Sequence, residues 1–240
     1  MGANDETDVG KTSRKYIREE NPSPSGLIEE SEQKHTEITS PSLIALHGYR
    51  FYADPGVFNP LLAGTSDLLA SHLYVPAGAV VLDLGTGTGL QALVASERAK
   101  TVLAIDQQSE AVACTRKNVA LNGLQAKIEV RQGDLFAAVQ AGETFDVIVF
   151  NIPYVPWKPE TPWQAANFDE GHQLLRRFLT QAKRYLRPGG HVVMTWSDIG
   201  DTAYLHTLLE EQGYAYKVLV ERQARDIGFY IYELRASGEG

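Results

Sequence analysis

Cysteine is almost absent from this sequence. The single residue, Cys114, excludes an internal disulfide and any metal site built on several thiolates. The six histidines are scattered, and none pairs with another at His-x-x-x-His spacing. No run of about 18 apolar residues occurs, and the first residues lack the apolar core of a signal peptide. We therefore expect a cytoplasmic protein that binds no metal and no membrane.

Basic residues are fewer than acidic residues in this sequence. The sequence has 22 Lys and Arg against 30 Asp and Glu, and its net charge of −8 disfavours broad binding to nucleic-acid phosphates. Apolar residues make up 43% of the chain, which is ample for one core. The length predicts one domain, with a possible appendage.

Residues 1–40 differ in composition from the rest. They are polar and charged and contain the stretch Asn21-Pro-Ser-Pro-Ser-Gly26, so we expect a disordered tail with one short helix near Ser13–Glu20. Gly10-Lys11-Thr12 resembles the end of a phosphate-binding loop. Asp5 stands where that loop requires glycine, and no strand precedes it, so we reject this interpretation.

The central pattern runs from Ala79 to Leu90. An apolar strand leads into three alternating glycines, and a helix is predicted over Leu90–Arg98, which is typical of the first unit of a nucleotide-binding α/β domain. The spacing is G-x-G-x-G rather than G-x-G-x-x-G. Asp83 precedes the loop, and an acid there disfavours a pyrophosphate. It suits a ligand with an ammonium group, such as S-adenosylmethionine.

Acidic residues also follow the next two predicted strands. Asp106 ends the strand Thr101–Asp106, where it can accept hydrogen bonds from ribose hydroxyls, and Asp134 follows the strand Lys127–Arg131. Each acid alone is compatible with a plain loop or helix cap, but together they favour a cofactor site. The predicted cofactor-binding residues are Asp83, Gly85, Thr86, Gly87, Gly89, Asp106, Gln107, Asp134, Leu135 and Asn151.

A second motif follows the predicted strand Phe145–Phe150. It is Asn151-Ile152-Pro153-Tyr154, and these four residues are the predicted catalytic residues. A planar NH2 group can donate to the Asn151 side-chain oxygen and to the Ile152 carbonyl, while Tyr154 stacks on its plane. Open α/β sheets place ligands at this end of a strand. The alternative is an ordinary turn after a buried strand.

The segments before and after these two motifs are predicted to cover the ligand crevice and to form the remaining helices and strands. A strand at Tyr49–Tyr52 and a helix from about Ser66 to Leu73 lie in the segment 41–78, which we expect to cover the ligand crevice. Further helices and strands alternate after the first motif. They are the helices Ser109–Asn122, Asp169–Leu186 and Asp201–Gln212, a turn at Arg187–Gly190, and the strands His191–Trp196, Tyr214–Glu221 and Ile227–Leu234.

These motifs, in this order, resemble class I S-adenosylmethionine-dependent methyltransferases. Asp83-Leu-Gly-Thr-Gly-Thr-Gly89 and Asn151-Ile-Pro-Tyr154 are most similar to the DLGTGTG and NPPY motifs of the release-factor glutamine N5-methyltransferases. The resemblance implies an α/β Rossmann-like domain over residues 79–236. Its sheet would be mostly parallel and seven-stranded, with helices on both faces and an antiparallel last strand. It also implies that Phe58, Thr65 and Trp157 are substrate-binding residues.

The resemblance implies transfer of a methyl group from S-adenosylmethionine to a protein glutamine amide, with S-adenosylhomocysteine as product. The implied partners are a protein such as a release factor and, in some members, an activator subunit. Ile152 replaces a proline of the motif, as in rRNA adenine N6-dimethyltransferases, and a polar tail replaces the helical N-terminal domain of bacterial members. An RNA or DNA adenine N6-methyltransferase, a small-molecule or peptide natural-product methyltransferase, and a non-catalytic cofactor-binding subunit therefore remain open alternatives.

Overall fold

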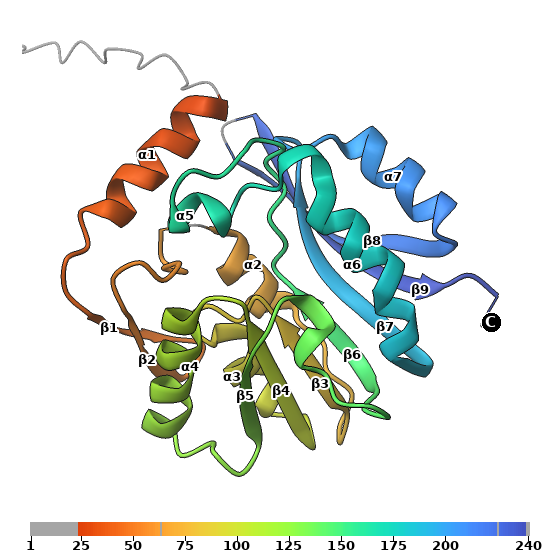
Figure 1. Cartoon of the computed structure of the whole chain (residues 1–240), viewed down its shortest axis with the longest axis horizontal. Coiled ribbons are helices and arrows are strands. Elements are labelled where there is room, and N and C mark those ends of the chain that lie inside the picture. The colour runs from red at the N-terminus through yellow and green to blue at the C-terminus, as the bar shows by residue number, and fades with distance from the viewer. Residues whose placement is uncertain (1–23, 63, 225, 239–240) are drawn as a thin grey trace, which may run out of the picture.

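A seven-stranded sheet forms the centre of the computed structural model, which describes residues 24–62, 64–224 and 226–238. The strand order is β5-β4-β3-β6-β7-β9-β8, and β9 runs antiparallel to both of its neighbours while β3 to β7 are parallel (Figure 1). The predicted sheet is thus confirmed. Its strands are β3 (Val80–Leu84), β4 (Thr101–Asp106), β5 (Ile128–Gln132), β6 (Phe145–Phe150), β7 (Leu186–Ser197), β8 (Tyr214–Ala224) and β9 (Ile227–Ala236).

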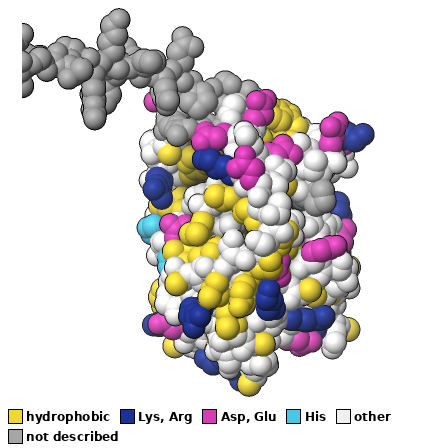
Figure 2. Space-filling model, turned by 90° about the vertical axis from the view of Figure 1, so that its left-hand side faces the viewer, with side chains coloured by type: hydrophobic (Ala, Val, Ile, Leu, Met, Phe, Trp, Pro, Cys, Tyr) yellow, Lys and Arg dark blue, Asp and Glu magenta, His cyan; other side chains and the backbone are white. Residues whose placement is uncertain are grey.

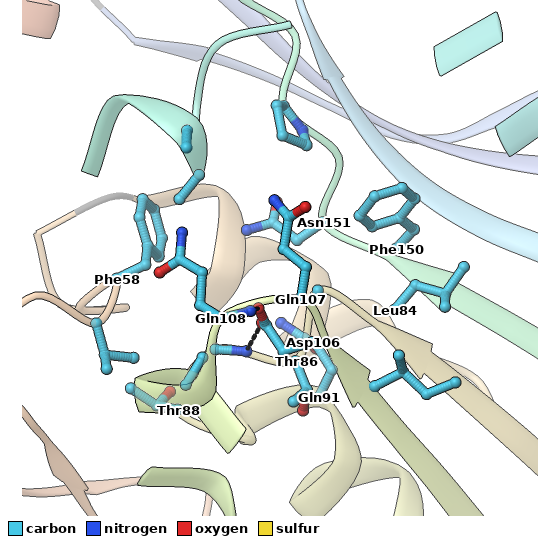
Figure 3. A pocket seen from close by; sticks show the side chains of 18 of the residues that line it. Phe58, Leu84, Thr86, Thr88, Gln91, Asp106, Gln107, Gln108, Phe150 and Asn151 are labelled. Carbon is cyan, nitrogen blue, oxygen red and sulfur yellow. Dashed lines mark hydrogen bonds between the residues drawn. The ribbon is translucent and has the colours of Figure 1, made fainter. Parts of the chain in front are cut away.

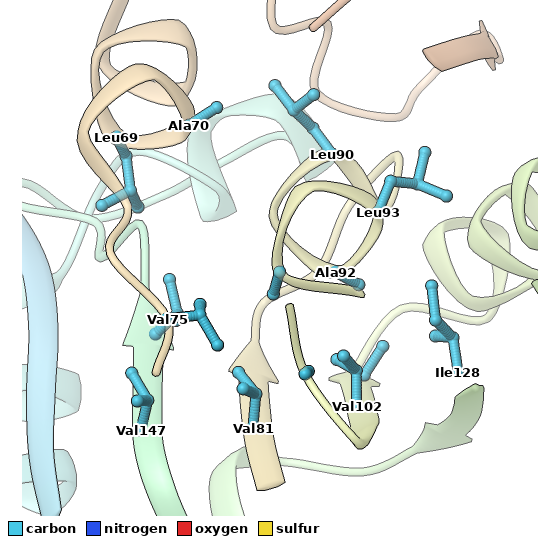
Figure 4. Close-up of a cluster of buried hydrophobic side chains, with 14 of the residues drawn as sticks. Leu69, Ala70, Val75, Val81, Leu90, Ala92, Leu93, Val102, Ile128 and Val147 are labelled. Carbon is cyan, nitrogen blue, oxygen red and sulfur yellow. The ribbon is translucent and has the colours of Figure 1, made fainter. Parts of the chain in front are cut away.

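Helices cover both faces of the sheet. Because successive side chains of a strand point to opposite faces, Val81 and Leu82 enter different cores. The core around Val81 packs against one helical layer (Figure 4), and the core around Leu82 packs against the other. The first layer holds α2 (Gly64–His72), α3 (Leu90–Ser96) and α4 (Ser109–Leu121), and the second holds the short helix η1 (Leu135–Ala138), α6 (Gln173–Ala182) and α7 (Thr202–Glu211).

The strand order reverses at β3, which pairs with β4 on one side and with β6 on the other. At such a switch point the loops after neighbouring strands diverge and leave a crevice at the carboxyl ends of the strands. The glycine loop, the segment after Asp106 and the motif beginning at Asn151 all leave the sheet at this edge. The topology therefore gathers the motifs that the sequence places far apart.

The predicted disordered tail is wrong for part of its length. Residues Pro24–Thr36 form helix α1, in which the side chains of Ile28 and His35 are buried. The composition of this segment carries too few apolar residues to predict order, and its burial depends on Trp163 and Phe58, which come much later in the chain. The short helix predicted near Ser13–Glu20 lies outside the described residues.

Three other predictions differ in detail. The predicted strand at residues 49–52 is half of a separate antiparallel hairpin, formed by β1 (Ser42–Leu46) and β2 (Tyr49–Ala53). The helix predicted over residues 169–186 is interrupted at its start, because Gly171 and His172 adopt positive φ angles of 59° and 56°. It comprises the short helix η2 (Glu170–His172), α6 and the short helix η3 (Lys183–Tyr185).

The turn predicted at residues 187–190 lies within β7 as an irregularity of the pairing with β6. Leu186 pairs with Phe145, and the next pair joins His191 to Val147, so the residues between them bulge.

A last short helix, α5 (Pro162–Ala165), lies beside α1 (Figure 1). None of the described helices is both long and apolar enough to cross a membrane.

Candidate active site

A main cavity opens at the carboxyl ends of β3, β4 and β6 (Figure 3). Its empty volume, open mouth included, is about 950 Å³. In the close-up, Phe58 lies across the cavity from Leu84 and Phe150, with Asp106 and Gln107 between them. Most of the predicted site residues line it, namely Phe58, Gly85, Thr86, Gly87, Asp106, Gln107, Asp134, Leu135, Asn151 and Pro153.

The glycine loop forms the floor beside β3. A Cβ on Gly85 would lie 3.1 Å from the Phe150 ring, and one on Gly89 would lie 3.0 Å from Thr115 Cγ2. Both glycines also have positive φ angles, of 61° and 86°, which side chains disfavour. The loop is fixed from α4, since the Thr115 hydroxyl donates to the Gly87 carbonyl at 2.8 Å. The result is a rigid cradle in which backbone can approach a ligand closely.

Asp106 closes the cradle from β4. One carboxylate oxygen accepts the Gly87 amide and the other accepts the Gln108 amide, both at 3.0 Å. Burial raises the pKa of this carboxyl above its usual value. Each carboxylate oxygen offers two lone pairs, so Asp106 retains the capacity to accept further hydrogen bonds from a ligand.

Asp134 stands on the wall after β5. Its carboxylate accepts a hydrogen bond from Arg177 of α6 at 2.5 Å, which fixes the direction of the side chain. Both side chains are about half exposed, so the pair contributes little to stability. The effect of the Asp134–Arg177 pair is local, because it holds the Asp134 carboxylate, a hydrogen-bond acceptor, at the cavity wall.

Asp83 lies beneath the loop and not among the residues that line the cavity. One of its carboxylate oxygens accepts the Thr86 hydroxyl at 2.7 Å and the Ala92 amide at 3.1 Å. The other has no hydrogen-bond partner among the described residues. Burial raises the pKa of Asp83 to about 7. The structure therefore gives Asp83 a role in holding the loop on α3, and direct contact with a ligand stays a prediction for Asp83 and for Gly89.

Asn151 begins the second motif at the end of β6. Its amide group donates to the Ser66 hydroxyl of α2 at 2.9 Å and accepts from the Thr195 hydroxyl of β7 at 2.8 Å. These two bonds orient the side-chain oxygen, which keeps a second lone pair. Ser66 and Asn151 both line the main cavity. The Ser66 and Thr195 hydroxyls thus hold Asn151 so that its Oδ1 can accept a hydrogen bond from a group bound in the cavity.

The rest of the motif points elsewhere. The Ile152 side chain is buried in the core around Leu82, while Tyr154 lines a second pocket together with Thr65. Burial raises the pKa of the Tyr154 hydroxyl. The Tyr154 ring packs edge-on against the Trp196 ring, with 6.3 Å between the ring centroids. The motif therefore divides the two cavities, with Asn151 and Pro153 on one side and Tyr154 on the other.

Trp157 is not brought to either cavity. Its side chain is 44% exposed and stacks edge-on against Phe168 at 5.6 Å. Trp163, six residues later, is buried and lines the second pocket. No sequence pattern distinguishes the two tryptophans, because the segment that contains both shows no periodicity.

Several site residues were not predicted from the sequence. Ser66, Gln91, Gln108 and Phe150 line the main cavity, and Thr195 orients Asn151 without lining it. A signal existed for Thr195, since a threonine inside the apolar strand Val-Val-Met-Thr-Trp needs a hydrogen-bond partner when buried.

Comparison with protein families matches residues 48–233 to the methyltransferase small domain. A Methanocaldococcus jannaschii chain provisionally named a protein N5-glutamine methyltransferase is 31% identical over 164 residues, covering 65% of this chain and 80% of that one. The release factor glutamine methyltransferase of Shewanella oneidensis is 37% identical over 146 residues, covering 54% and 50%. The ribosomal protein uL3 glutamine methyltransferase of Bordetella pertussis is 33% identical over 168 residues, covering 62% and 55%. The chain spans about half the length of these two bacterial relatives.

Solved structures share the fold. A 16S rRNA N2-methyltransferase of T. thermophilus, in complex with S-adenosylmethionine and guanosine, superposes with a TM-score of 0.63 at 25% identity, covering 82% of this chain and 50% of that one. A methyltransferase from Pyrococcus furiosus superposes with a TM-score of 0.61 at 20% identity, covering 87% and 98%. These likenesses confirm the predicted fold class.

Proposed function

The chain belongs to the methyltransferase small domain family, and from this premise we propose that it transfers the methyl group of S-adenosylmethionine to the side-chain amide of a protein glutamine. The observation that supports this most directly is the oriented amide of Asn151 at the edge of the main cavity. Relatives named for the methylation of release factors and of ribosomal protein uL3 support the choice of glutamine.

The main cavity fits the methyl donor. Glycines with positive φ angles form the loop, so no side chain of Gly85 or Gly87 stands between the loop backbone and a ligand in the cavity. Asp106 offers acceptors for ribose hydroxyls, and Asp134 offers one at the far wall. When bound, S-adenosylmethionine supplies an electrophilic methyl group on a sulfonium.

The acceptor nitrogen needs orientation more than activation by a base. An amide nitrogen is a poor nucleophile because its lone pair is delocalised. Asn151 Oδ1 and the Ile152 carbonyl would each accept one N–H of the acceptor, which points the nitrogen in one direction. Such positioning accounts for much of the rate, and the fixed oxygens favour the positive charge that develops on the nitrogen. Since burial raises the pKa of Tyr154, that hydroxyl stays protonated, and the proton of the product passes to water.

Charge favours a protein acceptor over RNA. The net charge is −8, and on the face shown in Figure 2 basic and acidic side chains are intermixed around a central hydrophobic area. A phosphate backbone binds through clustered positive charge. The adenine alternative uses the same Asn151 and Tyr154 with a flipped base, and it is the second reading to test.

The test is a transfer assay with tritiated S-adenosylmethionine. Purified protein is incubated separately with a release factor, with a cell protein extract and with total RNA. We expect label on the release factor, and loss of that label when its acceptor glutamine is replaced. Label on RNA alone would move the assignment to adenine. If no acceptor is labelled while S-adenosylhomocysteine binds, the protein glutamine assignment fails, unless added activator subunit restores transfer.

A further inference from the structure

Two segments outside the central sheet complete the wall of the main cavity. The segment between β2 and α2 contributes Val57 and Phe58, and the end of α5 contributes Ala165 and Ala166. Phe58 lies across the cavity from the labelled residues of β3 and β6 (Figure 3). The shape of the cavity therefore depends on what holds these two wall segments in place.

His35 of helix α1 is bonded to the first wall segment. Its Nε2 accepts a hydrogen bond from the Asn59 amide at 3.1 Å, and its Nδ1 donates to the Ser31 carbonyl at 2.8 Å. Both bonds require the neutral ring with its proton on Nδ1, and burial lowers the pKa of His35, which favours that form. The ring also stacks on Phe58, with 5.4 Å between the centroids and 28° between the planes. His35 thus fixes both the backbone of this segment and the Phe58 ring.

Glu32, three residues earlier on α1, is bonded to the second wall segment. Its carboxylate accepts hydrogen bonds from the Gln164 side chain at 3.0 and 3.1 Å and from the Thr161 hydroxyl at 3.2 Å. Gln164 belongs to α5, and Thr161 caps the start of that helix. Ile28, one further turn back, packs with Trp163 of α5 in one buried cluster. Helix α1 therefore holds both wall segments at once.

The helix acts on the main cavity only through these segments. Among the described residues that line the main cavity, none belongs to α1. The buried side chains that the structure describes in α1 are Ile28 and His35. Because so little apolar surface fixes the helix, it can detach at a low cost in free energy. The wall segments would then lose their hydrogen bonds to α1.

We propose that α1 retains the cofactor in the main cavity, with His35 and Glu32 as positioning residues that hold the two wall segments closed and thereby slow cofactor release. The inference rests on the proposed placement of S-adenosylmethionine in this cavity. It goes beyond the proposed function because it assigns a role to a helix outside residues 48–233, which match the family. The ligand leaves when the wall opens, so its release rate follows the fraction of time that α1 is detached. Conversely, a bound ligand that favours the closed wall must favour attached α1.

Hydrogen exchange measured by mass spectrometry tests this coupling. The full chain is compared with and without saturating S-adenosylhomocysteine, and exchange is followed at the α1 amides. Since no described residue of α1 lines the main cavity, direct contact with the ligand does not account for protection there. We expect the ligand to slow exchange in α1 by at least about fivefold, and His35→Ala to remove this effect.

The rate of release is the second measurement. Surface plasmon resonance on the immobilised protein follows dissociation of S-adenosylhomocysteine. We expect His35→Ala to release it about tenfold faster, because an aromatic contact and a hydrogen bond to the wall are lost. His35→Phe keeps a ring and His35→Gln keeps an acceptor for the Asn59 amide, so each should restore part of the slow release. Glu32→Ala, which frees the other segment, should also release the ligand faster than the wild type.

His206 on α7 provides the matched control. Like His35 it stacks on an aromatic ring, Tyr216, at 4.8 Å and makes a hydrogen bond, to the Tyr232 hydroxyl at 2.9 Å. It lines neither the main cavity nor the second pocket. His206→Ala should therefore release S-adenosylhomocysteine at the rate of the wild type. Calorimetry of each variant separates the two roles, because a helix that only stabilised the fold would lower Tm without changing release well below Tm.

A release rate in His35→Ala equal to that of the wild type would overturn the proposal, as would exchange in α1 that the ligand leaves unaltered. The proposed function fails separately. If the α1 variants release the ligand faster but no glutamine is labelled in the transfer assay, the retaining role of α1 stands and the acceptor assignment falls. If Asp106→Ala binds S-adenosylhomocysteine as the wild type does, the placement of the cofactor in this cavity falls, and the role of α1 falls with it.

Discussion

Asn151 is held by two hydroxyl groups that lie far from it in the sequence, Ser66 and Thr195. Thr195 is fully buried, so its hydroxyl has a fixed partner and direction. A side chain oriented in this way needs no rearrangement when a substrate binds, which is the property that electrostatic catalysis requires.

Replacing Asn151 separates binding from turnover. We expect Asn151→Ala to lower methyl transfer by about 10²-fold or more, because one of two acceptors for the substrate NH2 is lost. Affinity for S-adenosylhomocysteine should change by less than about threefold, since one neutral hydrogen bond is at stake. The transfer assay and calorimetry measure the two quantities. Asn122→Ala, which removes an amide at the end of α4, is the control, and normal transfer by Asn151→Ala would refute the mechanism.

Thr195 is a positioning residue for Asn151. Thr195→Val keeps the shape and removes the hydroxyl, and we expect methyl transfer to fall by about tenfold, in line with the loss of one buried hydrogen bond. The acceptor KM and kcat should both change, while affinity for S-adenosylhomocysteine stays constant. Thr195→Ser retains the hydroxyl and should restore transfer, and failure of that rescue would indicate a packing role instead.

Asp83 makes stability depend on pH. Burial raises the pKa of Asp83 to about 7, above its value in the unfolded chain, so the folded state binds more protons and stability falls as pH rises between those values. We expect wild type to lose about 2 kcal/mol relative to Asp83→Asn between pH 5 and pH 8. Urea unfolding of both proteins at both pH values measures this difference. A constant difference would show that Asp83 is charged in the folded state throughout.

At the scale of elements, the junction between β3 and α3 depends on positive φ angles that residues with a side chain rarely adopt. Gly89 precedes α3 with φ 86°, and Thr115 of α4 fills the space where its side chain would be. Because the same threonine also holds the Gly87 carbonyl, the loop and α4 form one unit. A change at Gly89 therefore reaches the cavity through the loop.

Gly89 and Gly142 make a matched comparison. Both have φ near 86° (86° and 87°), but a Cβ on Gly142 meets nothing within 4 Å. We expect Gly142→Ala to lower the free energy of unfolding by about 1 kcal/mol through backbone strain alone, and Gly89→Ala by about 2–3 kcal/mol through strain and steric overlap. Weaker binding of S-adenosylhomocysteine should appear in Gly89→Ala alone. Equal effects of the two substitutions would contradict this account of the loop.

At the scale of the whole molecule, the main cavity joins elements from both halves of the sheet. Residues from α2, the loops after β3 and β4, and the end of β6 line it together. A ligand bound there contacts segments that separate on unfolding. Binding should therefore stabilise the entire fold and not one element.

This coupling predicts a thermal shift. At a hundredfold excess over its Kd, S-adenosylhomocysteine should add about 2.7 kcal/mol of stability, which corresponds to a rise in Tm of about 5–10 °C for a chain of this size. Differential scanning calorimetry measures the shift. Asp106→Ala, which removes two bonds that hold the cradle, should abolish most of it at the same ligand concentration. An equal shift in that variant would exclude Asp106 from the cofactor site.

Local sequence patterns were enough to predict the cofactor cradle. Alternating glycines after a buried strand, and acids after the next two, are local patterns whose chemistry depends on a few neighbouring residues. Asp106, Asp134 and Asn151 were predicted from such patterns, and the structure places all three on one cavity. The mostly parallel sheet was expected from the resemblance that these motifs carry, and the structure confirms it.

Tertiary structure decided everything that depends on contacts between distant segments. Helix α1 has too few apolar residues to predict its order, and it folds against Trp163 and Phe58 because they complete its buried face. Asp83 sits next to the glycines in sequence, yet strand alternation and the start of α3 turn its carboxylate beneath the loop. No local pattern encodes a contact between residues that lie far apart in the sequence. Only the tertiary packing therefore decided that Trp163 lines a pocket while Trp157 does not, and that Ser66 and Thr195 orient Asn151.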